Sequence, residues 1–186
     1  MHKNIVIYLL LLLILGCETP GSKTLALSPR LDFKTDKQAL GFLVLATEDN
    51  IKKPRLDDRS IDVPIANKAT MVSELFREGL TAQGWTVIPA GSPLLPVPNP
   101  KNLTIGVKEF LVYLVPNVTH DTANLRFTLT FSYKKDGKTI TRTFNKRANQ
   151  NFPIKAGNND VKEFTEVALS EFIVSILKKN HLLESN

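Results

Sequence analysis

The strongest constraint on the fold is a strict alternation of apolar and polar residues over residues 125–133, followed by an Asp136-Gly137 pair. Alternation with a period of two places every second side chain on one face of a β-strand. Asp-Gly between two such stretches is typical of a two-residue hairpin turn, because both positions adopt positive φ angles. Residues 125–150 are therefore predicted to form a β-hairpin with these residues on its apolar face: Leu125, Phe127, Leu129, Phe131 and Tyr133.

The turn also sets the register of this hairpin, and with it the face on which each side chain lies. Arg142 is the exception on the predicted apolar face. It can lay its aliphatic stem along the sheet and hold its guanidinium at the rim, or it can serve as a binding residue. The predicted cross-strand neighbours are Lys135 with Lys138, Tyr133 with Ile140, Phe131 with Arg142, and Leu129 with Phe144.

Residues 103–115 are predicted to form a long strand in which the parity of the apolar residues changes near Lys108-Glu109. A one-residue β-bulge at that point would return all the apolar side chains to one face. The residues concerned are Leu103, Ile105 and Val107 before the change, and Phe110, Val112 and Leu114 after it.

Shorter segments are expected to complete the sheet. Residues 24–27 alternate, residues 39–47 form a compact apolar run, and residues 85–88 follow a glycine, so each predicts a strand. Residues 48–61 are charged and contain Pro54, which predicts a loop with at most a short edge strand. The proline-rich residues 89–100 predict an extended surface connection.

Two segments carry apolar residues at helical spacing and are predicted to be amphipathic helices. Thr70 and Asn159 are the predicted N-caps of the two helices, and Gly84 is predicted to end the first. The apolar face comprises Val72, Leu75, Phe76, Gly79 and Leu80 over residues 70–83, and Val161, Phe164, Ala168, Phe172, Ile173, Ile176 and Leu177 over residues 160–179.

The order of these elements predicts an α+β fold, with a mostly antiparallel sheet and two amphipathic helices packed on one of its faces. Residues 24–186 are expected to form this single domain, because the length suits one core.

The N-terminus predicts export. A short positive segment with Lys3 precedes an unbroken apolar run over residues 5–15, which is shorter than a comfortable membrane-spanning helix. Ile14-Leu15-Gly16-Cys17 resembles the bacterial lipobox, which implies that residues 1–16 are a signal peptide and that Cys17 is lipidated. Residues 17–23 would then be the lipidated cysteine and its tether. The alternatives are an ordinary signal with a chance cysteine, or an uncleaved anchor.

Glu18 follows the predicted lipidation site, where aspartate would mark retention in the inner membrane of enterobacterial lipoproteins. The presence of Glu18 in place of aspartate favours the outer membrane, with the domain facing the periplasm.

The sequence predicts no enzyme. It contains no recognised catalytic motif, and its histidines and single cysteine are too few for a metal site, so neither a cofactor nor a metal is expected. His120, beside Asp121 in the polar turn over residues 117–123, is a candidate binding residue together with Arg142; its alternative role is that of a solvated turn residue. The net charge of +6 is spread along the chain, which favours solubility over nucleic-acid binding.

The mature chain resembles the YajG-type lipoproteins, which are small lipid-anchored periplasmic proteins. The residues that carry the resemblance are T-L-A-L-S-P-R over 24–30, L-T-A-Q-G-W-T-V-I-P over 80–89, L-T-I-G-V-K-E-F over 103–110, and the closing hairpin and helix. The sequence departs from the family in its longer 49–62 loop and its proline-rich 89–100 segment. The resemblance implies no enzymatic activity.

These observations predict a lipid-anchored, non-enzymatic binding or scaffolding module of the cell envelope, with the membrane and an envelope protein as its partners. The alternative is an auxiliary lipoprotein subunit of an envelope lipid-transport or efflux system, because such subunits are similar in size and layout.

Metabolic labelling with a clickable palmitate analogue tests the lipidation of Cys17. The wild-type protein should be labelled, and Cys17→Ser should remove the label because no other thiol can form the thioether. An unlabelled wild-type protein recovered in the cytosol with residues 1–16 attached would contradict the prediction.

Overall fold

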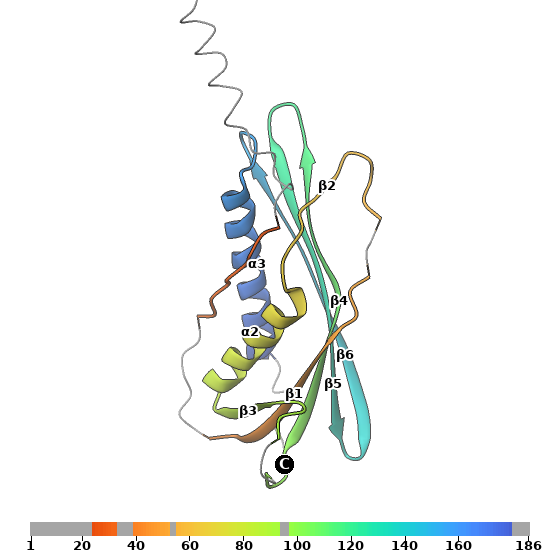
Figure 1. Ribbon diagram of the computed structural model, residues 1–186, viewed down its shortest axis with the longest axis vertical. Helices are drawn as coiled ribbons and strands as arrows, with labels where there is room; N and C mark the ends of the chain where they lie inside the picture. The colour runs from red at the N-terminus through yellow and green to blue at the C-terminus, as the bar shows by residue number, and fades with distance from the viewer. Residues whose placement is uncertain (1–23, 33–38, 53–54, 94–96, 180–186) are drawn as a thin grey trace, which may run out of the picture.

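The computed structural model describes residues 24–32, 39–52, 55–93 and 97–179, which build one mixed sheet and two helices (Figure 1). The predicted signal peptide, the tether and Cys17 lie outside the described residues. The strands are β1 (Gly41–Asp49), β2 (Ile61–Asp62), β3 (Trp85–Pro89), β4 (Lys101–Pro116), β5 (Asp121–Lys135) and β6 (Lys138–Phe152), and the helices are α2 (Lys68–Ala82) and α3 (Asn158–Lys179).

The sheet has the strand order β3-β1-β4-β5-β6, and β2 pairs with β4. β1 occupies the first half of one edge of β4, and β2 occupies part of the second half of that same edge. β5 pairs along the other edge of β4, so β6 is the last strand on that side of the sheet.

The predicted hairpin is confirmed with its register. β5 and β6 pair Lys135 with Lys138, Tyr133 with Ile140, Phe131 with Arg142, and Leu129 with Phe144. Asp136 and Gly137 have φ angles of 51° and 74°, which is the conformation that a two-residue hairpin turn requires.

The predicted bulge in the long strand is also confirmed. The pairing of β4 with β5 shifts between Val107 and Glu109, and the apolar residues on both sides of the shift are buried. The extra residue therefore keeps one continuous apolar face along the whole of β4.

The sheet is mostly antiparallel, as predicted, but β1 runs parallel to both β3 and β4. The parallel pairing arises because α2 crosses over between β1 and β3, and a crossover returns the chain in its original direction. The strand predicted at residues 24–27 is wrong. Leu25 makes only an isolated bridge with Ile65, closed by bonds from its amide to the Pro64 carbonyl (2.8 Å) and from the Ala66 amide to its own carbonyl (3.0 Å).

Both predicted N-caps are wrong, although the helices themselves are confirmed. Asn67, in the left-handed region at φ 48°, precedes α2, so Thr70 lies inside the helix. Asn159 lies inside α3, which starts one residue earlier. There the amide of Gly157 donates to the Asp160 carboxylate at 2.8 Å, which satisfies a free amide at the helix start. Gly84, at φ 96°, ends α2 as predicted.

Both helices cover the same face of the sheet (Figure 1), so the predicted α+β architecture is confirmed. Aromatic rings link the two layers. Phe131 on β5 meets Phe76 of α2 with ring centroids 5.0 Å apart, and Phe127 on β5 meets Phe172 of α3 at 5.7 Å. The core therefore lies between one face of the sheet and the two helices, and β5 contributes rings that contact both helices.

The opposite face of the hairpin is polar, and neither α2 nor α3 packs on it. Hydroxyl and amide side chains bond across β5 and β6 on this face, and the side-chain oxygens lie 2.8 Å apart for Thr122 and Asn151, 3.0 Å for Thr128 and Asn145, and 2.9 Å for Ser132 and Thr141. These pairs stabilise the register from the solvent side.

Phe127→Ala tests the importance of the layer contact. Phe127 has no exposed surface, so its truncation should lower the free energy of unfolding by about 3–5 kcal/mol in a urea titration. Phe144→Ala is the matched control, because Phe144 is only partly buried and should cost less. Equal losses for the two variants would contradict this placement of the core.

Candidate functional site

The structure does not bring the two candidate binding residues together. His120 directly precedes Asp121, which pairs with Phe152 at one end of the β5–β6 hairpin, whereas Arg142 pairs with Phe131 towards the other end. Arg142 is exposed on the helix-facing side of β6. His120 and Arg142 are therefore parts of separate surfaces.

The imidazole of His120 makes its contacts within the β4–β5 turn. Its Nδ1 lies 3.1 Å from the Thr119 hydroxyl, and its Nε2 lies 3.3 Å from the Asn117 side-chain amide nitrogen. The backbone amide of Asn117 also donates to the His120 carbonyl at 2.8 Å. Neither ring contact involves a carboxylate, so Asp121 does not orient the imidazole in the way that a catalytic pair requires.

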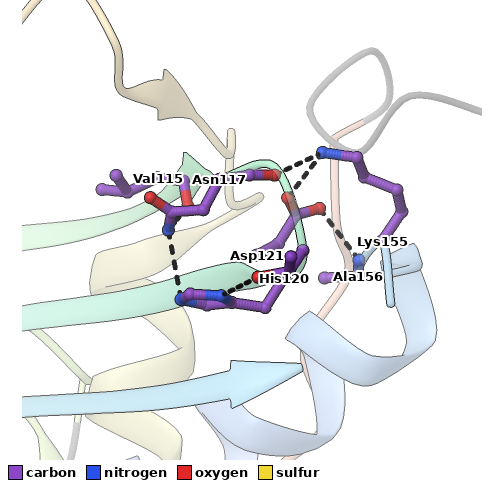
Figure 2. A network of polar contacts seen from close by, with 7 residues as sticks. Val115, Asn117, His120, Asp121, Lys155 and Ala156 are labelled. Carbon is purple, nitrogen blue, oxygen red and sulfur yellow. Dashed lines mark hydrogen bonds and ion pairs between the residues drawn. The ribbon is translucent and has the colours of Figure 1, made fainter. Parts of the chain in front are cut away.

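Asp121 instead holds the turn against the start of α3 (Figure 2). This residue is 3% exposed. One carboxylate oxygen lies 3.0 Å from the Lys155 ammonium, and the other accepts a bond from the Ala156 amide at 3.0 Å. Lys155 also donates to the Asn117 carbonyl at 3.3 Å. The network thus joins the β4–β5 turn to the loop that leads into α3.

The sequence contained a signal for this role that the prediction missed. Asp121 continues the parity of Ala123 and Leu125 along β5, so the alternation places it on the buried face. A carboxylate at such a position requires a partner, because an isolated buried charge is strongly unfavourable. The partner Lys155 is distant in sequence, so only the tertiary structure identifies it.

A groove lies between α3 and the edge strand β6. It encloses about 390 Å³. On β6, the lining of the groove includes every second residue, as expected for one face of a strand: Lys146, Ala148, Gln150 and Phe152. On α3, the lining residues recur at the spacing of one helical face: Asp160, Glu163, Phe164, Val167, Ala168 and Glu171.

The β6–α3 groove combines an apolar surface with acidic side chains. Phe152, Phe164 and Val167 make part of it apolar, and Val167 remains 52% exposed, which is unusual for a large aliphatic residue on a packed helix. Acidic side chains of α3 line the groove, and the carboxylate of one of them, Glu171, lies 3.9 Å from the Lys146 ammonium. An extended, partly apolar and basic segment would complement such a groove.

A second hollow, of about 480 Å³, lies between residues 26–30 and α2. Its lining includes Arg30, Glu74 and Glu78. The segment is tied to the helix layer by a hydrogen bond from the Ser28 amide to the Glu166 carboxylate of α3. This hollow is therefore formed by the N-terminal segment as it crosses the helices.

Two further features of the described ranges bear on function. Within residues 24–32, 39–52, 55–93 and 97–179, no group of three or more His, Cys, Asp or Glu side chains is placed to hold a metal ion. None of the helices in these ranges is both long and apolar enough to cross a membrane.

Residues 63–184 match the Lipoprotein_16 family model, which is described as "Uncharacterized lipoprotein". The match covers more than half of the chain, from the end of β2 through α3. The chain belongs to this lipoprotein family. The β6–α3 groove and the Asp121 network both lie within the matched part of the lipoprotein. No curated protein matches it.

Solved structures show distant similarity to the lipoprotein. A crystal structure of an uncharacterized protein has 12% identity and a TM-score of 0.44, with 84% of this chain and 99% of that chain covered. A putative neuraminyllactose-binding hemagglutinin homolog from Helicobacter pylori has 11% identity and a TM-score of 0.42, with 82% and 91% covered.

The hypothetical protein CT253 from Chlamydia trachomatis has 12% identity and a TM-score of 0.37, with 74% of this chain and 92% of that chain covered. Because all three TM-scores are below 0.5, the membership of the lipoprotein in its family rests on the family model.

Asp121→Ala tests the network in Figure 2. The substitution removes the bond to the buried Ala156 amide and the ion pair with Lys155, and should lower the free energy of unfolding by about 1.5–3 kcal/mol in chemical denaturation. Lys162→Met is the control, because the Glu166 carboxylate is more exposed than that of Asp121, and an i,i+4 ion pair of this kind should contribute only about 0.3–0.5 kcal/mol. A loss for Asp121→Ala no larger than that of the control would contradict the role of Asp121.

Proposed function

We propose that this lipoprotein is held by lipid on Cys17 at the outer membrane, faces the periplasm, and acts as a non-enzymatic binding module for an envelope protein. The family membership supports a lipid-anchored protein. The order Ile14-Leu15-Gly16-Cys17-Glu18 supports both the attachment point and the choice of membrane. The YajG-type resemblance supports the same placement and the absence of catalysis.

The observation that carries the binding role is the position of the β6–α3 groove beside an edge strand. In the part of the chain that the structure describes, β6 pairs only with β5, so the backbone groups along its outer edge are available to another strand. Addition of a strand to such an edge supplies affinity through main-chain hydrogen bonds and specificity through alternate side chains. Here the alternate side chains would enter the groove beneath α3.

The charges of the groove define the bound segment further. Side chains that point towards α3 would meet the apolar surface around Val167 and the carboxylates of Asp160 and Glu163. The bound segment should therefore alternate, with apolar residues directed at Val167 and basic residues directed at Asp160 and Glu163 and not at Arg142 and Lys146 of β6. Electrostatic complementarity of this kind governs which partner is selected and how fast it binds.

The charges of β6 oppose pairing with a second copy of the chain. All of its charged residues are basic, namely Lys138, Arg142, Lys146 and Arg147. An antiparallel pair of two β6 strands would bring these cations towards one another, and like charges across a strand pair are destabilising. The groove therefore suits a different protein better than another copy.

The polar groups that could serve catalysis have other roles in the fold, which supports a non-enzymatic protein. Asp121 is bonded to Lys155 and Ala156, and both ring nitrogens of His120 contact side chains of its own turn. The described residues that line the groove include no serine, threonine, cysteine or histidine.

Site-specific photo-crosslinking in living cells tests this function. A photoreactive amino acid in place of Val167 should capture an envelope protein, because Val167 lies in the groove and is half exposed. The same amino acid in place of Thr143 is the matched control, because Thr143 is an exposed residue on the opposite face of β6.

Glu163→Lys in the Val167 crosslinking variant should lower the yield several-fold, because it reverses a charge beside the expected basic residue of the partner. Equal capture from both positions, or a yield that Glu163→Lys leaves unchanged, would contradict binding in the groove. A captured subunit of a lipid-transport or efflux complex would establish the auxiliary-subunit alternative as the form that this binding takes.

A further inference from the structure

One end of the molecule carries an unusual share of exposed apolar side chains. We call it the turn end; it consists of the β4–β5 turn (residues 117–120), the loop over residues 153–157, and β2 (Figure 1). Among the described residues, the exposed large hydrophobic side chains are Ile61, Val118, Ile154 and Val167. The first three belong to the turn end, and the fourth belongs to the β6–α3 groove.

The side chains of the turn end project outwards. Val118 is 102% exposed and Ile154 is 78% exposed, so both extend from the tips of their loops. Projecting apolar tips do not form the concave, closely packed surface that a protein partner requires. They suit a fluid surface into which each tip can insert separately, and the interface of a lipid bilayer is such a surface.

The two loops are held in a fixed relation to each other. Lys155 bridges them, because its ammonium contacts both the Asn117 carbonyl and the Asp121 carboxylate (Figure 2). Asp121 in turn fixes the Ala156 amide. Val118 and Ile154 thus lie on two loops that polar contacts hold together. Their insertion would therefore cost little conformational entropy from ordering of the loops.

The chain reaches the fold from the direction of the turn end. Leu25 bridges Ile65 in parallel, and β2, just before Ile65, runs antiparallel to β4. Since β4 runs towards the β4–β5 turn, the segment that starts at Thr24 runs away from it, as the red segment in Figure 1 shows. Cys17 is close enough to Thr24 in sequence that the connection spans at most about 25 Å.

The charges of the turn end are compatible with a membrane surface. Lys155 directly follows Ile154 in sequence and contacts the turn that carries Val118 through the Asn117 carbonyl, and its side chain is 61% exposed. The neighbouring loop over residues 55–60 carries Asp57 and Asp58 together with Arg55 and Arg59, so its formal charges cancel. The pKa of Asp57 is lowered, chiefly by the hydrogen bond from the Ser60 hydroxyl.

We propose that the turn end rests on the bilayer, with Val118 and Ile154 inserted at the level of the lipid headgroups. This inference rests on the proposed lipid anchor at Cys17. The hairpin turn at Asp136-Gly137 then lies at the end away from the membrane, and the β6–α3 groove faces sideways above the bilayer, within reach of a neighbouring membrane protein.

The test uses the full lipidated protein in vesicles made of equal parts phosphatidylethanolamine and phosphatidylglycerol. Val118→Cys and Ile154→Cys each introduce one thiol, which is labelled with a nitrobenzoxadiazole fluorophore, because lipid occupies the only natural thiol. Lys138→Cys, an exposed position beside the hairpin turn at the far end, is the matched control. Quenching is measured with aqueous iodide and with doxyl-labelled lipid.

Labels at Val118 and Ile154 should be quenched by the doxyl lipid and shielded several-fold from iodide, whereas the label at Lys138 should show the opposite behaviour. Val118→Asp in the Ile154→Cys protein should restore quenching by iodide, because a carboxylate on the neighbouring loop opposes insertion. The fold should tolerate these changes, since both side chains project into solvent.

The outcomes separate this inference from the anchor on which it rests. A protein that floats with the vesicles but shows equal iodide quenching at Val118 and Lys138 would overturn the docking of the turn end and leave the anchor intact. A protein that does not float, or whose natural thiol reacts with the fluorophore, would overturn both.

Discussion

The structure depends on the burial of every second side chain of β5 between the sheet and the two helices. Phe131 contacts α2 and Phe127 contacts α3, so aromatic rings of this one strand reach both helices. β4 and β6 flank this strand and extend its apolar face. Because such burial supplies most of the stability of a small domain, the positions of the helices follow from the positions of these rings.

The surfaces available for function follow from this one-sided packing. α3 covers the helix-facing side of β5 and only part of β6, so a groove remains along the edge strand. The uncovered face of the hairpin is filled by threonine, serine and asparagine pairs that bond to each other. The groove thus combines concave shape, apolar surface and a strand edge that pairs with no further strand among the described residues, and these features favour recognition of an extended segment.

Predictions that rested on interactions between residues close in sequence were accurate, whereas those that depended on how distant segments meet were not. The hairpin register and the bulge in β4 were predicted because alternation and turn chemistry act over a few residues. The caps of both helices were wrong because Asn67 adopts a left-handed conformation and Asp160 reaches back to Gly157. In each case the residue at which the helix begins depends on how the preceding segment enters the fold, which residue preference alone does not determine.

For the candidate sites the same distinction holds. His120 and Arg142 stood out as isolated polar residues, and the structure places them on separate surfaces. The groove combines residues of β6 with residues of α3, and no local pattern links the period of a strand to that of a helix. The parallel position of β1 was missed for a related reason, since the direction of a strand depends on the crossover of α2.

By itself, the sequence determined the elements, the hairpin register, the apolar faces and the α+β class, because these follow from periodicity and turn residues that are close along the chain. Only the tertiary structure decided the parallel pairing of β1, the ion pair between Asp121 and Lys155, the groove beside β6 and the cluster of exposed apolar tips at the turn end. Each of these depends on bringing distant segments together, and that arrangement is selected by the burial of the whole core rather than by any single segment.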